Sequence, residues 1–242
     1  MRFKRFCSLG VAAAIGMSIL AGTAAAKETT TGVGFDFNQN DGGFTPIFSD
    51  YPNEQGVEEF YELRSGHEEV PVADAGKGLF LSGNNHSDDL FMGYFKELSG
   101  LAPETEYQFT VRFKLATNVE NDMIGIGGAP GESVFVKCGV ASEEPENSLD
   151  SLNHFRLNID KGSQSTSGSD MIVVGNLAKE EINRPGEYEF NEIETKVIAR
   201  TDEAGTAYLV IGTDSGFEGV TSYYLDDISV SWADTSEVSV TR

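Results

Sequence analysis

The stretch Thr221–Trp232 reads TSYYLDDISVSW, and from Ile228 to Trp232 apolar residues alternate with serines. Neighbouring side chains of an extended chain point to opposite faces, so this period of two predicts a strand with one buried face. Asp226 and Asp227 stand just before the alternating part. Two adjacent carboxylates in a strand need a cation or a hydrogen-bond donor for at least one of them, which marks this position as a candidate ion site.

The same alternation recurs along the chain, and it is clearest from Glu106 to Thr117. Apolar residues on both faces of 171–174 predict a central strand, and a change of phase between Phe190 and Ile193 predicts a bulge. Short strands separated by turn residues, without a long amphipathic helix or an internal repeat, favour an all-β fold. We therefore expect one jelly-roll-like β-sandwich domain. The further strands are expected within 33–37, 79–81, 90–95, 134–140, 153–160 and 207–211.

Residues 1–26 have the features of a cleaved secretory signal peptide. Arg2, Lys4 and Arg5 precede a short apolar run, and Ala24 to Ala26 offer a small-residue cleavage site. The run is too short for an ordinary membrane span. The sequence thus predicts a secreted or periplasmic protein whose mature part, residues 27–242, is not inserted in a membrane.

The chain is strongly acidic, with 39 acidic and 17 basic residues and a formal net charge of −22. Such a charge repels nucleic acid phosphates and anionic lipid surfaces, so neither is an expected partner. It favours solubility and cation binding. Acidity and export are also all that an acidic surface or matrix structural protein would require, and this alternative stays open.

The segment YYLDDISV, residues 223–230, resembles the closing strand of carbohydrate-binding-module-type jelly rolls. Across more of the chain, SGNNHSDDLF, GGAPGES, NIDKG and GTDSGFEG resemble motifs of a group of uncharacterised secreted bacterial β-sandwich proteins. The resemblance implies the sandwich fold and export. It supplies no activity, and in the jelly rolls it implies a structural calcium ion shared by the first and last strands.

The first predicted strand runs into GVGFDFNQNDGG, residues 32–43, which is rich in carboxylate and amide oxygens. Such hard oxygen ligands suit Ca²⁺. Together with the resemblance, this segment makes Asp36, Asp226 and Asp227 the predicted metal ligands. The alternative is that these Asp and Asn residues only form a turn.

Two polar loops suggest a ligand site, and the first of them carries His86. Asn85, His86 and Asp88 lie in a polar loop between two apolar strands, in the stretch GNNHSDD. Asp214 lies in a second such loop, just before the closing strand. Imidazole and carboxylate groups in this arrangement could bind a metal or orient a hydrogen bond.

The segment 153–160 is predicted to be a strand that buries its apolar residues and presents a polar row on its other face. Alternate residues of a strand are about 7 Å apart, so this row spans roughly two or three sugar rings. It combines donors and acceptors for hydroxyl groups with one cation for an acidic sugar. An ordinary solvated strand face is the alternative. The row consists of His154, Arg156, Asn158 and Asp160.

These features support a secreted, non-catalytic binding protein with a glycan or envelope polysaccharide as partner and calcium as a structural ion. The alternative is a polysaccharide hydrolase or lyase that uses His86 or His154 as the base. A carboxylate of Asp88, Asp160 or Asp214 would serve as the acid or ligand. If His86, His154 and Asp214 meet in space, the enzyme hypothesis gains support.

Overall fold

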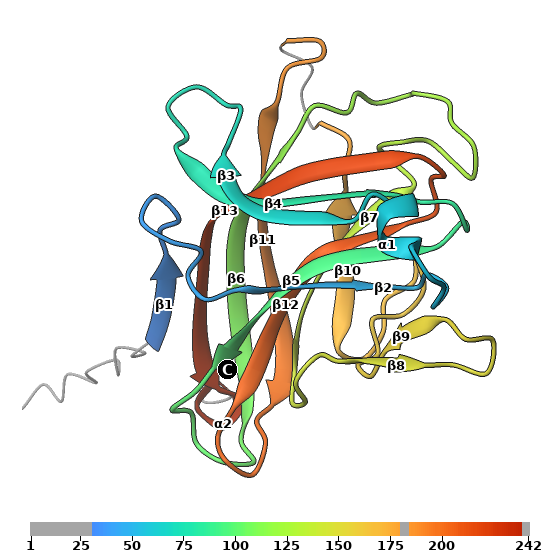
Figure 1. The fold of residues 1–242 in the computed structure, drawn as a ribbon. Coiled ribbons are helices and arrows are strands. Elements are labelled where there is room, and N and C mark those ends of the chain that lie inside the picture. The colour runs from blue at the N-terminus through green and yellow to red at the C-terminus, as the bar shows by residue number, and fades with distance from the viewer. Residues whose placement is uncertain (1–30, 180–183, 239–242) are drawn as a thin grey trace, which may run out of the picture.

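The structure is a computed structural model, and it describes residues 31–179 and 184–238. Strands account for most of the secondary structure and pair antiparallel, as Figure 1 shows. The predicted signal peptide lies outside the described residues. The elements are β1 (Thr31–Phe35), β2 (Thr45–Ser49), α1 (Val57–Phe60), β3 (Arg64–Glu69), β4 (Lys77–Asn84), β5 (Leu90–Leu98), β6 (Glu106–Thr117), β7 (Val134–Ala141), β8 (Asn147–Leu149), β9 (Phe155–Leu157), β10 (Met171–Asn176), β11 (Glu189–Arg200), β12 (Ala207–Ser215), β13 (Val220–Asp234) and α2 (Thr235–Val238).

Two sheets form a jelly-roll-like β-sandwich, which confirms the predicted fold class. The six-stranded sheet has the order β11-β6-β13-β4-β3, with β1 added to β13, and the five-stranded sheet has the order β10-β7-β12-β5-β2. Alternate residues of both sheets point inward and make the core, in which Phe109, Leu115, Leu209 and Tyr223 are fully buried. This packing of two apolar faces supplies the main driving force for folding.

The closing strand β13 is the centre of the six-stranded sheet. Its first part pairs with β4, its last part pairs with β1, and β6 lies along its other side. The register shifts between Asp226 and Ser229, and Asp227 adopts a positive φ of 49°. The two adjacent aspartates thus form a bulge at the point where β13 changes neighbours.

Three details of the predicted strands are wrong. The register of β11 with β6 runs without a shift from Glu189 to Arg200, so the bulge expected near Phe190 is absent there. The strand β10 is an edge strand rather than a central one, since it pairs only with β7. Its apolar residues on the outer face are explained by Met171, which packs in the cluster formed with Ile159 of residues 142–170. The third concerns 153–160, where β9 contains only Phe155–Leu157.

The excursion between β7 and β10, residues 142–170, covers the outer face of the five-stranded sheet. Ile159 from this excursion packs against Phe91, Phe95 and Val210 on that face. The β8–β9 hairpin lies next to β2, as Figure 1 shows. The outer face of the six-stranded sheet instead carries side chains that remain exposed, among them Arg64, Arg112 and Glu194.

Candidate functional site

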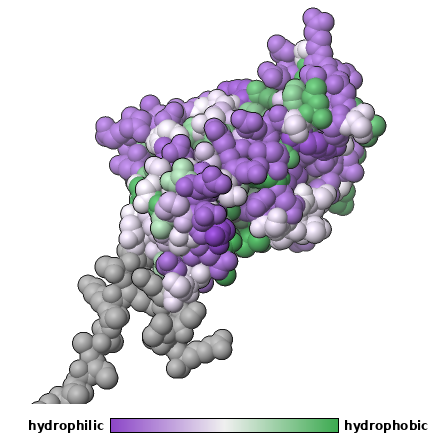
Figure 2. Space-filling model, turned by 90° about the horizontal axis from the view of Figure 1, so that it is seen from below, coloured by the Kyte–Doolittle hydropathy of each residue, from purple (hydrophilic) through white to green (hydrophobic). Residues whose placement is uncertain are grey.

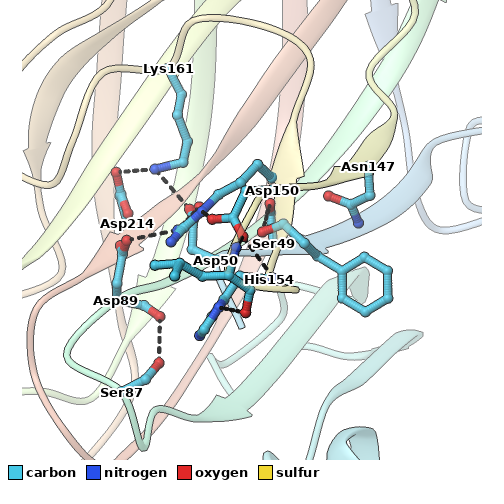
Figure 3. A network of polar contacts seen from close by, with 12 residues as sticks. Ser49, Asp50, Ser87, Asp89, Asn147, Asp150, His154, Lys161 and Asp214 are labelled. Atoms are coloured by element: carbon cyan, nitrogen blue, oxygen red, sulfur yellow. Dashed lines mark hydrogen bonds and ion pairs between the residues drawn. The ribbon is translucent and has the colours of Figure 1, made fainter. Parts of the chain in front are cut away.

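The predicted ligand residues Arg156 and Asp214 belong to an ionic network beneath residues 142–170, which we call the cover. Lys137 and Asp214, on neighbouring strands β7 and β12, are both fully buried, and Nζ of Lys137 lies 2.9 Å from Oδ2 of Asp214. Lys161 reaches the same oxygen at 2.8 Å and Oδ2 of Asp50 at 2.9 Å. Figure 3 shows Lys161 between these two carboxylates. The network therefore ties the cover to the middle of the sheet.

Arg156 continues this network outward. Its Nη1 lies 2.7 Å from Asp50 and 3.3 Å from Asp89, and its Nε donates to Asp150 at 3.0 Å. Desolvation alone would lower the pKa of Arg156, but the hydrogen bonds that it donates to Asp50 and Asp150 outweigh this effect and the pKa is raised. The guanidinium is thus committed to carboxylates of its own chain. It is not the free cation that the sequence suggested for an acidic sugar.

Carboxylate oxygens of Asp50, Asp89 and Asp214 lie within 4.8 Å of one another. Asp50 and Asp89 line an open pocket of 370 Å³, whereas Asp214 is fully buried. Burial raises the pKa of Asp89 to about 7, and the carboxylates of Asp50 and Asp214 add to the shift. Burial also lowers the pKa of Lys137. In this part of the described chain, the four carboxylates of Asp50, Asp89, Asp150 and Asp214 meet the three basic groups of Lys137, Lys161 and Arg156, so most of the charge is offset within the network.

The remaining members of the predicted row 154–160 hold loops in place. His154 Nδ1 lies 3.1 Å from the carbonyl oxygen of Leu152. The side chain of Asn158 bonds the backbone of Glu144 and Glu146, and Asp160 accepts from the backbone N–H groups of Gly162 and Ser169. These bonds lower the pKa of Asp160, those of Ser169 first. The row is therefore not an open strand face.

The histidine loop is also fastened to its surroundings. His86 stacks on Phe60 with ring centroids 4.1 Å apart, and its Nε2 lies 3.1 Å from the carbonyl oxygen of Phe60. Asn85 is buried and donates to two backbone carbonyls of the β12–β13 connection. The backbone carbonyl of Asp88 accepts a hydrogen bond from the side chain of Gln164. Asp88 itself adopts a positive φ of 60°. No contact among the described residues joins His86, His154 and Asp214 to one another.

The predicted metal residues gather at the gap between β4 and β1. Asp36, Asp226 and Asp227 line one hollow of 560 Å³ together with Asn38 and Asp74. Burial raises the pKa of Asp226, and the nearby charges of Asp227 and Asp36 act in the same direction. One carboxylate oxygen of each of these three aspartates already has a partner within the protein.

Asp36 accepts from Asn38, Asp226 accepts from the N–H of Asp227, and Asp227 lies 3.0 Å from Lys114. One oxygen of each carboxylate is used in this way. For the residues that the structure describes, no donor contacts the second oxygen. The donor set is hard and oxygen-rich, as Ca²⁺ requires. The three residues therefore have the ligand type that calcium requires. One oxygen of Asp227 is already paired with Lys114.

An open groove runs across the six-stranded sheet, and sequence reasoning did not find it. Three hollows of 380, 560 and 410 Å³ join through shared wall residues: Val72 and Ala73 connect the first two, and Lys114, Asp227 and Ser229 connect the last two. We call these joined hollows the sheet groove. It follows β11, β6 and β13, under the loop that connects β3 and β4.

Tyr188 and Phe190 line the sheet groove, and the partly exposed Tyr224 and the buried Phe80 continue from them across the sheet. Phe190, Tyr224 and Phe80 occupy one cross-strand row, interrupted by Ala116 of β6. Tyr188 stands above it, 5.6 Å from the ring of Tyr224, and its hydroxyl lies 3.2 Å from Ser222. We call these four residues the aromatic row. The outward phase of Tyr224 is readable from the alternation in β13, but its neighbours come from strands more than 30 residues away.

Hydrophilic residues predominate on the face of the molecule in Figure 2, and hydrophobic residues form separate small areas there. Among the described residues, no helix is both long and apolar enough to cross a bilayer. This face therefore offers scattered apolar positions for contact rather than one broad apolar area.

Comparisons with known proteins give similarity of fold. No family model and no curated protein matches the sequence. Among solved structures, the chain is similar to a putative sugar binding protein from Bacteroides thetaiotaomicron, with 10% identity, a TM-score of 0.40 and coverage of 81% of this chain and 90% of that one. A xylan-binding module from Paenibacillus barcinonensis gives 9%, 0.40, 87% and 99%, and a family 11 carbohydrate-binding module from Clostridium thermocellum gives 12%, 0.37, 82% and 94%.

Proposed function

We propose that the protein is an exported, non-catalytic glycan-binding protein whose ligand lies in the sheet groove. The observation that carries the proposal is the aromatic row beside a hollow on an uncovered sheet face. Tyr188 and Phe190 line the groove itself and are partly exposed. An aromatic ring offers a flat apolar surface with a polar edge, which suits the apolar face of a sugar ring.

The polar walls of the groove supply partners for sugar hydroxyls. Arg112 and Glu194, paired at 2.8 Å, and Lys114 and Asp227, paired at 3.0 Å, present donors and acceptors on neighbouring strands. Arg112, Glu194 and Asp227 are each more than half exposed, so sugar hydroxyls can reach them. Such exposed pairs are weak, and a ligand can compete for their donors and acceptors.

The side chains of the two predicted bases, His86 and His154, are not joined to an acid among the described residues, and this favours binding over the predicted catalysis. A catalytic pair needs hydrogen-bond contact between the base and its partners. In the described chain, His86 and His154 each bond a backbone carbonyl, and Asp88 contacts neither of them through a hydrogen bond. A hydrolase would have to assemble its acid and base from groups that now hold loops together.

Calcium is part of this proposal as a structural ion. Asp36, Asp226 and Asp227 would hold it between the first and last strands, beside the start of β4 and the end of β1. When bound, the ion would neutralise carboxylates that now repel one another. It would stabilise the gap rather than take part in a reaction.

The test is a depletion experiment with mature protein and a panel of insoluble polysaccharides, followed by mass spectrometry of the supernatant. We expect one polysaccharide to remove the protein from solution without releasing oligosaccharides. Release of new oligosaccharides that His86→Ala or His154→Ala abolishes would instead establish an enzyme. If no polysaccharide removes the protein, the glycan proposal is wrong.

A further inference from the structure

The charge of the sheet groove restricts the kind of glycan that can enter it. Its wall contains eight acidic and three basic side chains, a formal excess of five negative charges. The acidic residues are Asp36, Asp74, Glu187, Glu189, Glu192, Glu194, Asp226 and Asp227, and the basic ones are Arg112, Lys114 and Arg184.

Each basic residue of the groove is already paired with one of these acids. Arg112 lies 2.8 Å from Glu194, and Lys114 lies 3.0 Å from Asp227. Arg184 lies 3.2 Å from Glu187. Among the described residues, a carboxylate of a uronic acid polymer would thus find no basic group in the groove wall without an acidic partner. It would meet an excess of like charge at close range, which disfavours association.

Glu189 is paired as well, with Lys179 at 3.5 Å. The other acids of the wall are spread along the groove. Glu192 on β11 pairs in register with Lys114 on β6, which pairs in turn with Asp226 on β13. Strands of a sheet are about 4.8 Å apart, so Glu192 and Asp226 are separated by roughly 10 Å across the sheet. Asp74 adds a third acid from the loop above. Because these acids are separated from one another, a ligand that pairs with several of them must carry cationic groups at more than one position along its length.

We propose that the sheet groove selects a linear amino-sugar polysaccharide with free ammonium groups over neutral and uronic acid polysaccharides. This inference rests on the proposed function, because it assumes that the groove is the glycan site. Sugar rings would lie against the aromatic row, and the ammonium groups would pair with acids such as Glu192 and Asp74. A calcium ion at Asp36 and Asp226 would reduce the negative excess from five to three and leave its sign unchanged.

Glu192 and Asp74 make the best test because they lie outside the predicted calcium ligands. Glu192 is exposed on a strand, and Asp74 has a positive φ of 60°, a conformation that asparagine also tolerates. The groove variant is therefore Glu192→Gln with Asp74→Asn. The control is Glu143→Gln with Glu144→Gln, which removes the same charge from exposed positions on the cover.

The experiment measures dissociation constants of the full chain at physiological salt for four oligosaccharides of similar length. The probes are a glucosamine oligomer, its N-acetylated form, a neutral β-glucan and an oligogalacturonate. We expect the glucosamine oligomer to bind most tightly. The groove variant should weaken this binding about fivefold, and the control variant should leave it nearly unchanged.

Each other outcome overturns the inference in a recognisable way. Equal or tighter binding of the neutral or uronic acid oligomer contradicts the selectivity and leaves the glycan function standing. Equal weakening by the groove and control variants means that the ligand responds to the total charge of the protein. Binding of none of the four, together with no depletion by any polysaccharide, removes the proposed function as well.

Discussion

Nζ of Lys161 lies 2.8 Å from Oδ2 of Asp214, and this contact joins the cover formed by residues 142–170 to the middle of the five-stranded sheet. Asp214 is fully buried, and the same oxygen also accepts from the backbone N–H of Gln164. Desolvation acts to lower the pKa of Lys161, but Asp214 and Asp50 outweigh it and raise the value. The folded protein thus favours the charged form of Lys161.

Lys161→Met should destabilise the protein strongly, because it leaves Asp50 and Asp214 with fewer cations. Loss of one partner of a buried ion pair costs about 3 kcal/mol or more. Urea unfolding measures the change. Arg112→Met is the matched control, since Arg112 is exposed and its pair with Glu194 should contribute less than about 1 kcal/mol. Equal effects of the two substitutions would contradict the assigned role of Lys161.

Asp89 should make stability depend on pH. Its pKa is raised to about 7 in the folded protein, against an ordinary value of about 3.9 in the unfolded chain. Between these values the folded state holds a proton that the unfolded state has released. The contribution of Asp89 to the free energy of unfolding is therefore present at low pH and is lost as pH rises towards and through 7.

The measurement is the free energy of unfolding of the wild type and of Asp89→Asn at several pH values from 4 to 9. The difference between the two proteins isolates this group from the other carboxylates. We expect the wild type to lose stability relative to the variant up to about pH 7 and to change little beyond it. A difference that stays constant across the range would contradict the pKa of Asp89.

Tyr188→Ala should weaken binding of the depleting polysaccharide by about tenfold, because it removes a ring that lines the sheet groove. Its side chain is partly exposed, so the fold should survive, and thermal melting checks this. Phe60→Ala is the control, since Phe60 is 62% exposed and lies outside the groove. Loss of binding in Phe60→Ala alone would move the site to the loop end of the sandwich.

Removal of calcium should lower the melting temperature if the ion binds between β1 and β13. An ion present at one hundred times its dissociation constant contributes about 2.7 kcal/mol. EDTA should therefore lower the melting temperature of the wild type by several degrees and leave that of Asp226→Asn almost unchanged. An unchanged melt of the wild type would refute the calcium proposal.

The strands that could be predicted from the sequence are those with one buried face. The strand β6 runs from Glu106 to Thr117, as its alternation indicates, and β13 includes the whole of the stretch from Thr221 to Trp232. In both, local pattern and final burial agree. The prediction failed for 153–160, since the alternation there reflects a short strand followed by loops that Asn158 and Asp160 hold by hydrogen bonds.

The candidate site was harder to predict because its parts are distant in the sequence. Arg156 looked like a free cation, but Asp50 pairs with it from 106 residues away. No local pattern reports such a partner. The aromatic row has the same character, since Phe80, Phe190 and Tyr224 become neighbours only through the pairing of four strands.

The cover over the five-stranded sheet also limits the number of sheet faces on which a ligand can bind. Within the described residues, Ile159 and Lys161 fill one sheet face from above, and the face with the sheet groove stays open. A sandwich with two free faces could cross-link polymer chains. With one face closed, a single copy that binds through the groove can decorate a polysaccharide but cannot bridge two strands of it, so any gel-forming behaviour would require self-association.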